Sequence, residues 1–290
     1  MPILNLIFQY TKAAIKLYIL KTLKIKRLEV HLIKKIFLTL ILFNLNTINA
    51  QTVLDTINSV NNKLIVSSIK ESKKEYLVYL ADSNKNRKNI GDIWKRTIKF
   101  NNLNGKRIIE FGWEWYIKDG KLYKTVTNLC DAQTLAPIYH KTVSNSTGDP
   151  RYDRELGIKA YDFVDNKMIP SDSVKDNIVA GKVPVNIDIP ILSWELDLET
   201  FETLPIKSVG QKFAVSFFDP SEDKPEYHIY EVTGEELLKL NTDAVIECWT
   251  LIIKYDDVNY AKFWLSGKSK EVIKMEEYFN GFYRIKELLF

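Results

Sequence analysis

Two glutamates, Glu110 and Glu114, lie on the same face of one predicted strand, as a catalytic acid pair would. Side chains four residues apart on a strand are separated by about 13 Å. The two carboxyl groups of a glycosidase lie roughly 5–9.5 Å apart. The spacing therefore excludes this pairing, and we expect both residues to face solvent or the rim of the sheet.

No set of side chains predicts a metal site. The acidic stretch Asp219, Glu222, Asp223 and Glu226 offers oxygen ligands of the kind calcium takes, but it lacks the spacing and the glycine of the common calcium loop. Zinc sites usually need three or more closely spaced ligands, and neither His140 nor His228 belongs to such a cluster. We predict a solvated turn, two structural histidines, no metal and no cofactor.

Nucleophile motifs give no catalytic residue. There is no G-x-S-x-G elbow, P-loop or dinucleotide glycine fingerprint, and the S-x-x-K matches at residues 67–70 and 221–224 lack their partner motifs. The two cysteines, Cys130 and Cys248, could form a disulfide in an oxidising compartment. The alternative is two separately buried small apolar side chains.

Residues 1–50 differ from the rest of the chain. They hold eight Lys or Arg residues and one acid, and Lys34-Lys35 precede the apolar run at 36–43. This pattern, ending in Ala50, predicts a signal peptide cleaved after Ala50. The apolar run is shorter than the about 20 residues of a membrane span. An uncleaved anchor or a basic amphipathic helix is the alternative, and a start codon assigned too early would explain residues 1–26.

The charge balance follows from this segment. The whole chain has 41 basic and 37 acidic residues, a net charge of +4. Without residues 1–50 the counts become 33 and 36, a net charge of −3. The basic excess therefore belongs to the export segment, and no nucleic-acid partner follows from it. We expect one β domain over residues 51–290, without a transmembrane span, in the periplasm.

The apolar pattern predicts mostly antiparallel strands. Apolar residues alternate through 244–255 and 260–266, and the short polar turns between such runs allow only antiparallel neighbours. The segments at 92–101 and 106–118 read as a hairpin. Further strands are predicted at 63–70, 76–81, 121–130, 137–144, 158–164 and 211–219. Residues 52–61, 171–180 and 192–201 are predicted as short or weak helices.

Four motifs in the last part of the chain carry a resemblance. They are Tyr-Glu-Val-x-Gly-Glu-Glu at 230–236, Glu-Cys-Trp at 247–249, Ala-Lys-Phe-Trp-Leu-Ser at 261–266 and Val-Ile-Lys-Met at 272–275. The chain resembles an uncharacterised family of exported Bacteroidetes-type proteins, a domain of unknown function. The resemblance implies a curved antiparallel sheet forming a half-barrel, similar in shape to the periplasmic carriers of lipoproteins. It assigns no functional residue.

The large aromatic residues supply the functional hypothesis. On a curved sheet they could line an apolar groove for a lipid tail or another hydrophobic ligand, or they could fill the core. The candidate ligand-binding residues are Phe111, Trp113, Trp115, Trp194, Phe213, Trp249 and Trp264. The leading hypothesis is an exported, non-enzymatic binding or carrier protein for a lipid-like ligand of the cell envelope. The alternatives are a structural partner that docks another envelope protein, and a hydrolase whose acids converge only in the fold.

Overall fold

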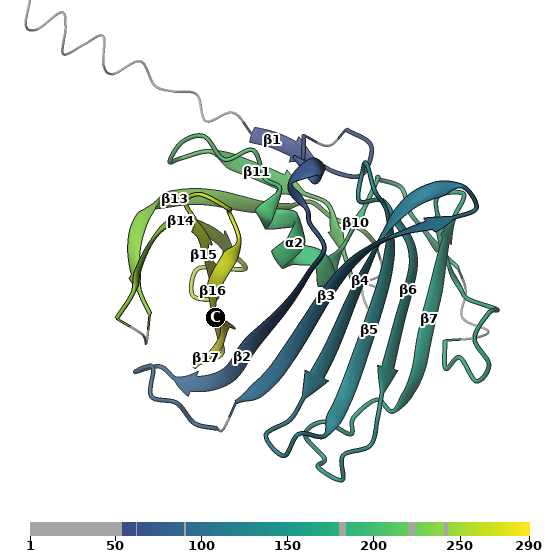
Figure 1. Ribbon diagram of the computed structural model, residues 1–290, viewed down its shortest axis with the longest axis horizontal. Coiled ribbons are helices and arrows are strands. Elements are labelled where there is room, and N and C mark those ends of the chain that lie inside the picture. Colours follow the sequence, from purple (N-terminus) through teal and green to yellow (C-terminus); the bar gives the residue numbers. More distant parts are fainter. Residues whose placement is uncertain (1–53, 62, 90, 180–183, 220–223, 241–242) are drawn as a thin grey trace, which may run out of the picture. The chain divides into compact units, whose positions relative to one another are not determined.

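The computed structural model describes residues 54–290 except 62, 90, 180–183, 220–223 and 241–242 (Figure 1). The expected signal peptide and its cleavage after Ala50 lie outside these residues. The described residues belong to one compact unit, Thr52–Phe290. No helix in the described part of the chain is both long and apolar enough to cross a membrane.

One large sheet contains nearly all the strands. Its order is β1-β11-β13-β14-β15-β16-β17-β2-β3-β4-β5-β6-β7-β8-β9. The strands of the N-terminal half are β1 (Leu54–Ile57), β2 (Ser72–Asp82), β3 (Asp92–Leu103), β4 (Lys106–Tyr116), β5 (Leu122–Asp131), β6 (Pro137–Ser144), β7 (Gly157–Val164), β8 (Lys167–Pro170) and β9 (Val185–Asn186). Those of the C-terminal half are β11 (Lys212–Val215), β13 (His228–Lys239), β14 (Val245–Lys254), β15 (Tyr260–Ser266), β16 (Val272–Phe279) and β17 (Phe282–Leu289). A second, two-stranded sheet pairs β10 (Leu192–Ser193) with β12 (Phe217–Phe218).

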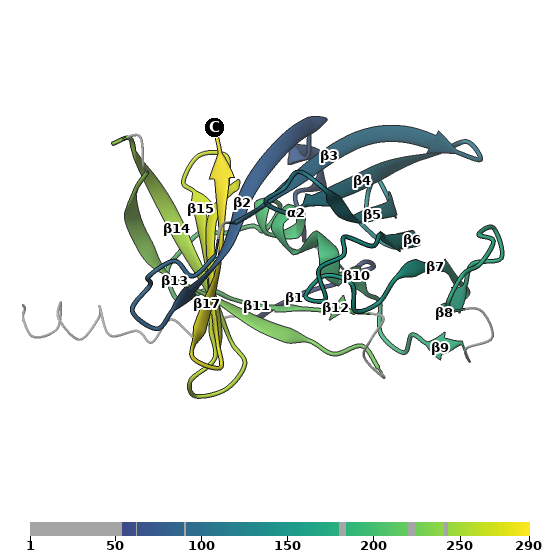
Figure 2. The ribbon, with the colours of Figure 1, turned by 90° about the horizontal axis from the view of Figure 1, so that it is seen from below.

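The two halves of the large sheet meet where β17 pairs with β2. The pairing is antiparallel and places Leu288 opposite Tyr76 and Lys286 opposite Val78. Figure 2 shows β17 and β2 together between the two groups of strands. The sheet curves, and its order ends at β1 and β9 without closing. The predicted mostly β, half-barrel fold is confirmed, with the parallel pairs β1–β11 and β10–β12 as exceptions to the antiparallel rule.

A short helical segment packs on the concave side of this sheet. It consists of the 3₁₀ turn η2 (Trp194–Leu196) and helix α2 (Asp197–Glu202), which Figure 1 shows inside the curve of the strands. Phe201 is fully buried there, with its ring 4.7 Å from that of Phe263 and 4.9 Å from that of Tyr230. The predicted helix over 192–201 is therefore confirmed at its core. We call the side of the sheet that faces α2 the inner face.

Strand register assigns each side chain to a face. Neighbouring partners on the inner face form the row Val232, Leu251, Phe263, Met275, Lys286 and Val78. The row directly next to it on the outer face is Thr250, Trp264, Lys274, Glu287 and Leu77. A bulge in β13, between Val232 and Gly234, shifts the register so that Leu238 joins the outer face.

Three sequence predictions of local structure are wrong. Residues 63–70 do not form a strand: Val66–Ser68 is a 3₁₀ turn, η1, because Ile65 donates its N–H to the Thr203 carbonyl and apolar side chains of the segment turn into the core. The weak helix expected at 52–61 contains strand β1, since β11 supplies its hydrogen bonds. A helix is expected at 171–180, but residues 171–179 form turns. The Asn177 side chain holds them there, because it binds the backbone N–H and C=O of Ala160.

Candidate binding site

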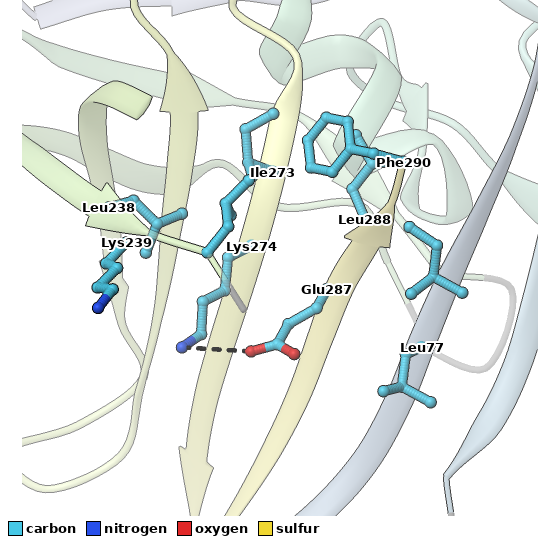
Figure 3. A pocket seen from close by; sticks show the side chains of 10 residues that line it. Leu77, Leu238, Lys239, Ile273, Lys274, Glu287, Leu288 and Phe290 are labelled. Atoms are coloured by element: carbon cyan, nitrogen blue, oxygen red, sulfur yellow. Dashed lines mark ion pairs between the residues drawn. The ribbon is translucent and has the colours of Figure 1, made fainter. Parts of the chain in front are cut away.

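A pocket of about 230 Å³ lies on the outer face of the C-terminal strands and β2 (Figure 3). The strand register explains its position, because Leu77, Lys274 and Glu287 are successive partners on that face. The lining is mostly apolar and consists of Leu77, Leu238, Lys239, Leu240, Ile273, Lys274, Glu287, Leu288, Leu289 and Phe290. We call this the outer pocket.

The outer pocket is unusual for its side of the sheet. On β3 and β4 the outer face carries polar residues such as Lys95 and Glu114, which are partners across those strands. At the outer pocket the corresponding positions hold Leu77 and Leu238, both half-buried. Figure 3 shows an ion pair among these side chains, between Lys274 Nζ and Glu287 Oε1 at 3.5 Å, and the further cation Lys239. The sequence therefore builds a mostly apolar hollow whose charged side chains are the Lys274–Glu287 pair and Lys239, which pairs with Asp243.

A second cavity, of about 180 Å³, lies on the inner face beside η2 and α2. We call it the inner chamber. Two of its tryptophans, Trp94 and Trp115, stack with ring centroids 4.0 Å apart and planes within 8°. Lys124 Nζ lies 4.4 Å from the Trp115 ring and Lys286 Nζ lies 5.0 Å from the Trp94 ring, both within cation–π range. The lining is Trp94, Trp113, Trp115, Lys124, Trp194, Glu195, Asp197, Asp219, Tyr230, Tyr255, Phe263, Met275, Glu277, Arg284 and Lys286.

A more open hollow of about 430 Å³ adjoins the chamber. It shares Trp194, Tyr255, Glu277 and Arg284 with the chamber. Its other lining residues are apolar and at least partly exposed: Leu80, Phe279 and Phe282. We call it the mouth. Chamber and mouth together offer charged and aromatic groups inside and an apolar surface outside.

The structure separates the seven predicted aromatic residues. Trp113, Trp115 and Trp194 line the inner chamber. Phe111 and Phe213 are fully buried core residues. The remaining two are Trp249, which packs against the core, and Trp264, which lies on the outer face. There Trp264 donates its Nε1–H to Glu236 Oε2 over 2.9 Å.

A buried charge network fixes α2 to the sheet near the chamber. Arg96 and Glu199 are both fully buried, and the guanidinium lies 3.1 Å from the carboxylate. Arg96 also contacts Glu202, at 3.3 Å, and Lys74 binds Glu202 at 3.0 Å. Burial raises the pKa of Glu199 to about 7, although the positive charge of Arg96 opposes this shift. Because each charge has a partner, this network is structural.

Lys286 differs from Arg96 in having no such partner. Its side chain is only 8 % exposed, and no acidic side chain of the described residues lies within 4.0 Å of its Nζ atom. Burial lowers its pKa below that of an exposed lysine, while Asp197 partly opposes the shift. Sequence analysis did not single it out. No sequence pattern marks it, because only the strand pairing with Met275 and Val78 places it on the inner face.

The other sequence candidates stay apart from one another. The Glu110 carboxylate binds Asn101 and the Glu114 carboxylate accepts from Tyr116 OH. His140 is buried, with Nδ1 2.8 Å from Asn128 Oδ1 and Nε2 3.0 Å from Thr142 Oγ1, and burial lowers its pKa. Within the described residues no group of three or more His, Cys, Asp or Glu is placed to hold a metal ion.

The residues of the acidic stretch lie in different surroundings. Asp219 lines the inner chamber and Glu226 pairs with Lys224, whereas residues 222 and 223 lie outside the described part of the chain. Cys130 and Cys248 are both buried and free of a disulfide. They lie on β5 and β14, which are far apart in the sheet order. In this structure the two cysteines are therefore separately buried small side chains and not a disulfide.

Residues 75–286 match the family model described as "Protein of unknown function (DUF3108)", so the chain belongs to this uncharacterised family. No match is found among curated proteins. Among solved structures, the fold is similar to a "putative lipoprotein" from Parabacteroides distasonis, at 9% identity over 76% of this chain and 94% of that one, with a TM-score of 0.31. It is also similar to a DUF1329 family protein from Desulfovibrio piger, at 10% identity over 77% and 85%, with a TM-score of 0.20. At these TM-scores neither likeness bears on function.

Proposed function

We propose that this protein is an exported, periplasmic, non-enzymatic binding or carrier protein, and that the outer pocket takes an apolar or lipid-like group. The observation that carries the proposal is the mostly apolar lining of a hollow on the outer face of the sheet. Sites for apolar ligands are concave and lined by such side chains with a few polar groups. Lys274 and Glu287 form an ion pair in the pocket, so neither of these two charges lies unpaired against an apolar ligand.

The pocket volume limits what fits. The cavity volume is about 230 Å³. This suits the end of an acyl chain or a small apolar molecule, with the remainder of a longer ligand outside. Leu289 and Phe290, 43 % and 79 % exposed, extend the apolar surface of the pocket toward solvent.

The experiment is native mass spectrometry of the protein purified from a periplasmic preparation, followed by solvent extraction and lipid analysis. A co-purifying apolar molecule in stoichiometric amount is the expected result. A titration with the neutral fluorophore N-phenyl-1-naphthylamine then locates the site. Leu238→Glu places a charge in the pocket and should abolish the fluorescence increase. Leu237→Glu is the matched control, because Leu237 is 75 % exposed and does not line the pocket.

Two results would contradict the proposal. One is an unliganded protein that stays unliganded when envelope lipids are added. The other is fluorophore binding that Leu238→Glu and Leu237→Glu affect equally. The second candidate function, docking of another envelope protein, predicts instead that the same apolar surface captures a polypeptide and that Leu238→Glu abolishes that capture.

A further inference from the structure

We propose that the inner chamber is a second binding site, in which Lys286 holds the anionic head group of an amphiphile, a carboxylate or a phosphate, while the apolar part lies in the mouth. The site lies on the inner face, opposite the outer pocket. The inference therefore goes beyond the proposed function and does not depend on it.

The position of Lys286 is the first step of the argument. Its strand partners on the inner face are Met275 and Val78, and the next residue in the row is Phe263. A buried ammonium among apolar neighbours is costly unless an anion accompanies it. Arg96, on the same face, has Glu199 and Glu202 as its anions. Among the described residues Lys286 has no acid within 4.0 Å; its ammonium lies 5.0 Å from the Trp94 ring, and Asp197 acts on it from farther away.

The second step is the chemistry of the unsatisfied groups around Lys286. Four lining side chains each have a buried N–H without a hydrogen-bond partner in the described residues: Nε1 of Trp94, Trp113 and Trp115, and Nε of Arg284. These four groups are donors, like the ammonium group of Lys286, whereas the described lining has one such acceptor, Glu195 Oε2, which lies 3.5 Å from His140 Nδ1. A ligand that satisfies them must supply acceptor oxygens, and an anionic oxygen accepts the strongest hydrogen bonds.

The acids that line the chamber are the third step, because they could repel an anion. Glu277 Oε2 lies 2.6 Å from Arg284, so its charge is paired. Asp197 accepts the N–H of Leu198 at 2.7 Å, which uses one oxygen at the start of α2. Glu195 lies between Lys124, at 3.7 Å, and His140, at 3.5 Å. Asp219 also lines the chamber and has an interaction of its own. Asp197 favours the charged form of Lys286 from a distance, but none of these four acids lies within 4.0 Å of its Nζ atom.

The mouth supplies the apolar half of the ligand. Leu80, Phe279 and Phe282 are 45 %, 52 % and 54 % exposed, and all three line the hollow that adjoins the chamber. Leu80 on β2 and Arg284 on β17 are strand partners. The apolar side chain of Leu80, which lines the mouth, therefore lies next to the charged side chain of Arg284, which lines the chamber. This arrangement matches a molecule with an anionic end and an apolar chain.

The test compares four ligands with the same apolar chain: dodecanoate, dodecyl phosphate, dodecanol and dodecylamine. Trp94, Trp113, Trp115 and Trp194 line the chamber, so intrinsic tryptophan fluorescence reports occupancy, and titration calorimetry gives the dissociation constant. The measurements use the full chain carrying Leu238→Glu, so that binding in the outer pocket does not contribute. We expect dodecanoate or dodecyl phosphate to bind and Lys286→Met to weaken that binding by about tenfold or more.

Lys262→Met is the matched control. Lys262 Nζ also lies over a tryptophan ring, that of Trp264 at 4.4 Å, but it is on the outer face and pairs with Glu236. Its replacement should leave dodecanoate binding unchanged. A preference between the carboxylate and the phosphate would identify the head group. Equal affinity for dodecanol or dodecylamine, no binding of either anion, or binding that Lys286→Met leaves intact would overturn the inference.

Discussion

Arg96 and Glu199 form an ion pair of 3.1 Å in which both side chains are fully buried. Arg96 belongs to β3 and Glu199 to α2, so the pair joins the helix to the sheet across more than a hundred residues of sequence. A fully buried charge keeps its place only with a partner. The contact therefore fixes how α2 fills the concave side of the sheet.

Replacing Arg96 tests this role. Arg96→Met leaves Glu199 buried without its cation and removes one partner of Glu202, so we expect a loss of about 3 kcal/mol in the free energy of unfolding. Urea unfolding followed by circular dichroism measures it. Lys95→Met is the control, because Lys95 makes an exposed pair with Glu75 and should change stability by less than about 1 kcal/mol. Equal effects of the two variants would contradict a structural role for the buried pair.

The raised pKa of Glu199 predicts a pH dependence of stability. Its pKa is about 7 in the folded protein and 4.5 as the ordinary value, so the folded state binds more protons between these pH values. The free energy that Glu199 contributes is therefore present below about pH 4.5 and lost as the pH rises through about 7. In Glu199→Gln this change is absent. Chemical unfolding at several pH values should show that the free energy of unfolding of the wild type, minus that of Glu199→Gln, decreases as the pH rises from about 4.5 through about 7. A value that stays constant or increases contradicts the prediction.

Phe201 tests the packing of α2 against the C-terminal strands. Its fully buried ring contacts those of Phe217, Tyr230 and Phe263, with centroid distances from 4.7 to 5.9 Å. Phe201→Ala removes these contacts and leaves a cavity, which costs about 3–5 kcal/mol in a core. Phe279→Ala, at a residue that is 52 % exposed, should cost much less. Thermal unfolding of both variants checks the prediction, and a small effect of Phe201→Ala would show that the segment can repack.

Lys286 should lower the free energy of unfolding of the ligand-free protein. Replacing it by Met removes a buried ammonium without an acidic partner, and we expect the free energy of unfolding to rise by about 1 kcal/mol or more. The rise should be smaller at high pH, because the lowered pKa of Lys286 makes the ammonium lose its proton in the folded state first. Asp197, Glu199 and Glu277 oppose this shift, and Arg284 adds to it. A less stable Lys286→Met variant in urea unfolding would mean that Lys286 stabilises the ligand-free fold.

The two cysteines should behave as inert thiols. Both are buried without a disulfide, and burial raises the pKa of Cys248 to about 11. We expect slow alkylation by iodoacetamide in the folded protein and fast alkylation in urea. A reducing agent should leave the melting temperature unchanged. A melting temperature that falls on reduction would show that the cysteines are bridged in solution.

The sequence by itself determined the β class and much of the strand pattern. Alternating apolar residues with polar turns predicted the strands at 244–255 and 260–266, because neighbours joined by short turns must be antiparallel. The same local reasoning failed where a distant segment supplies the hydrogen bonds, as β11 does for β1 and Thr203 does for Ile65. It also gave no sign of β17, the strand that joins the two halves of the sheet.

The binding sites needed the tertiary structure. Aromatic residues on strands could be identified from their spacing, yet only the folded chain shows that Trp113, Trp115 and Trp194 meet in the inner chamber while Phe111 fills the core. The contrast between Arg96 and Lys286 is also invisible in the sequence. Both are cations on the inner face of the sheet, and what distinguishes them is whether α2 brings a carboxylate within ion-pair distance. Burial and distance decide this, and they depend on contacts between residues far apart in the chain.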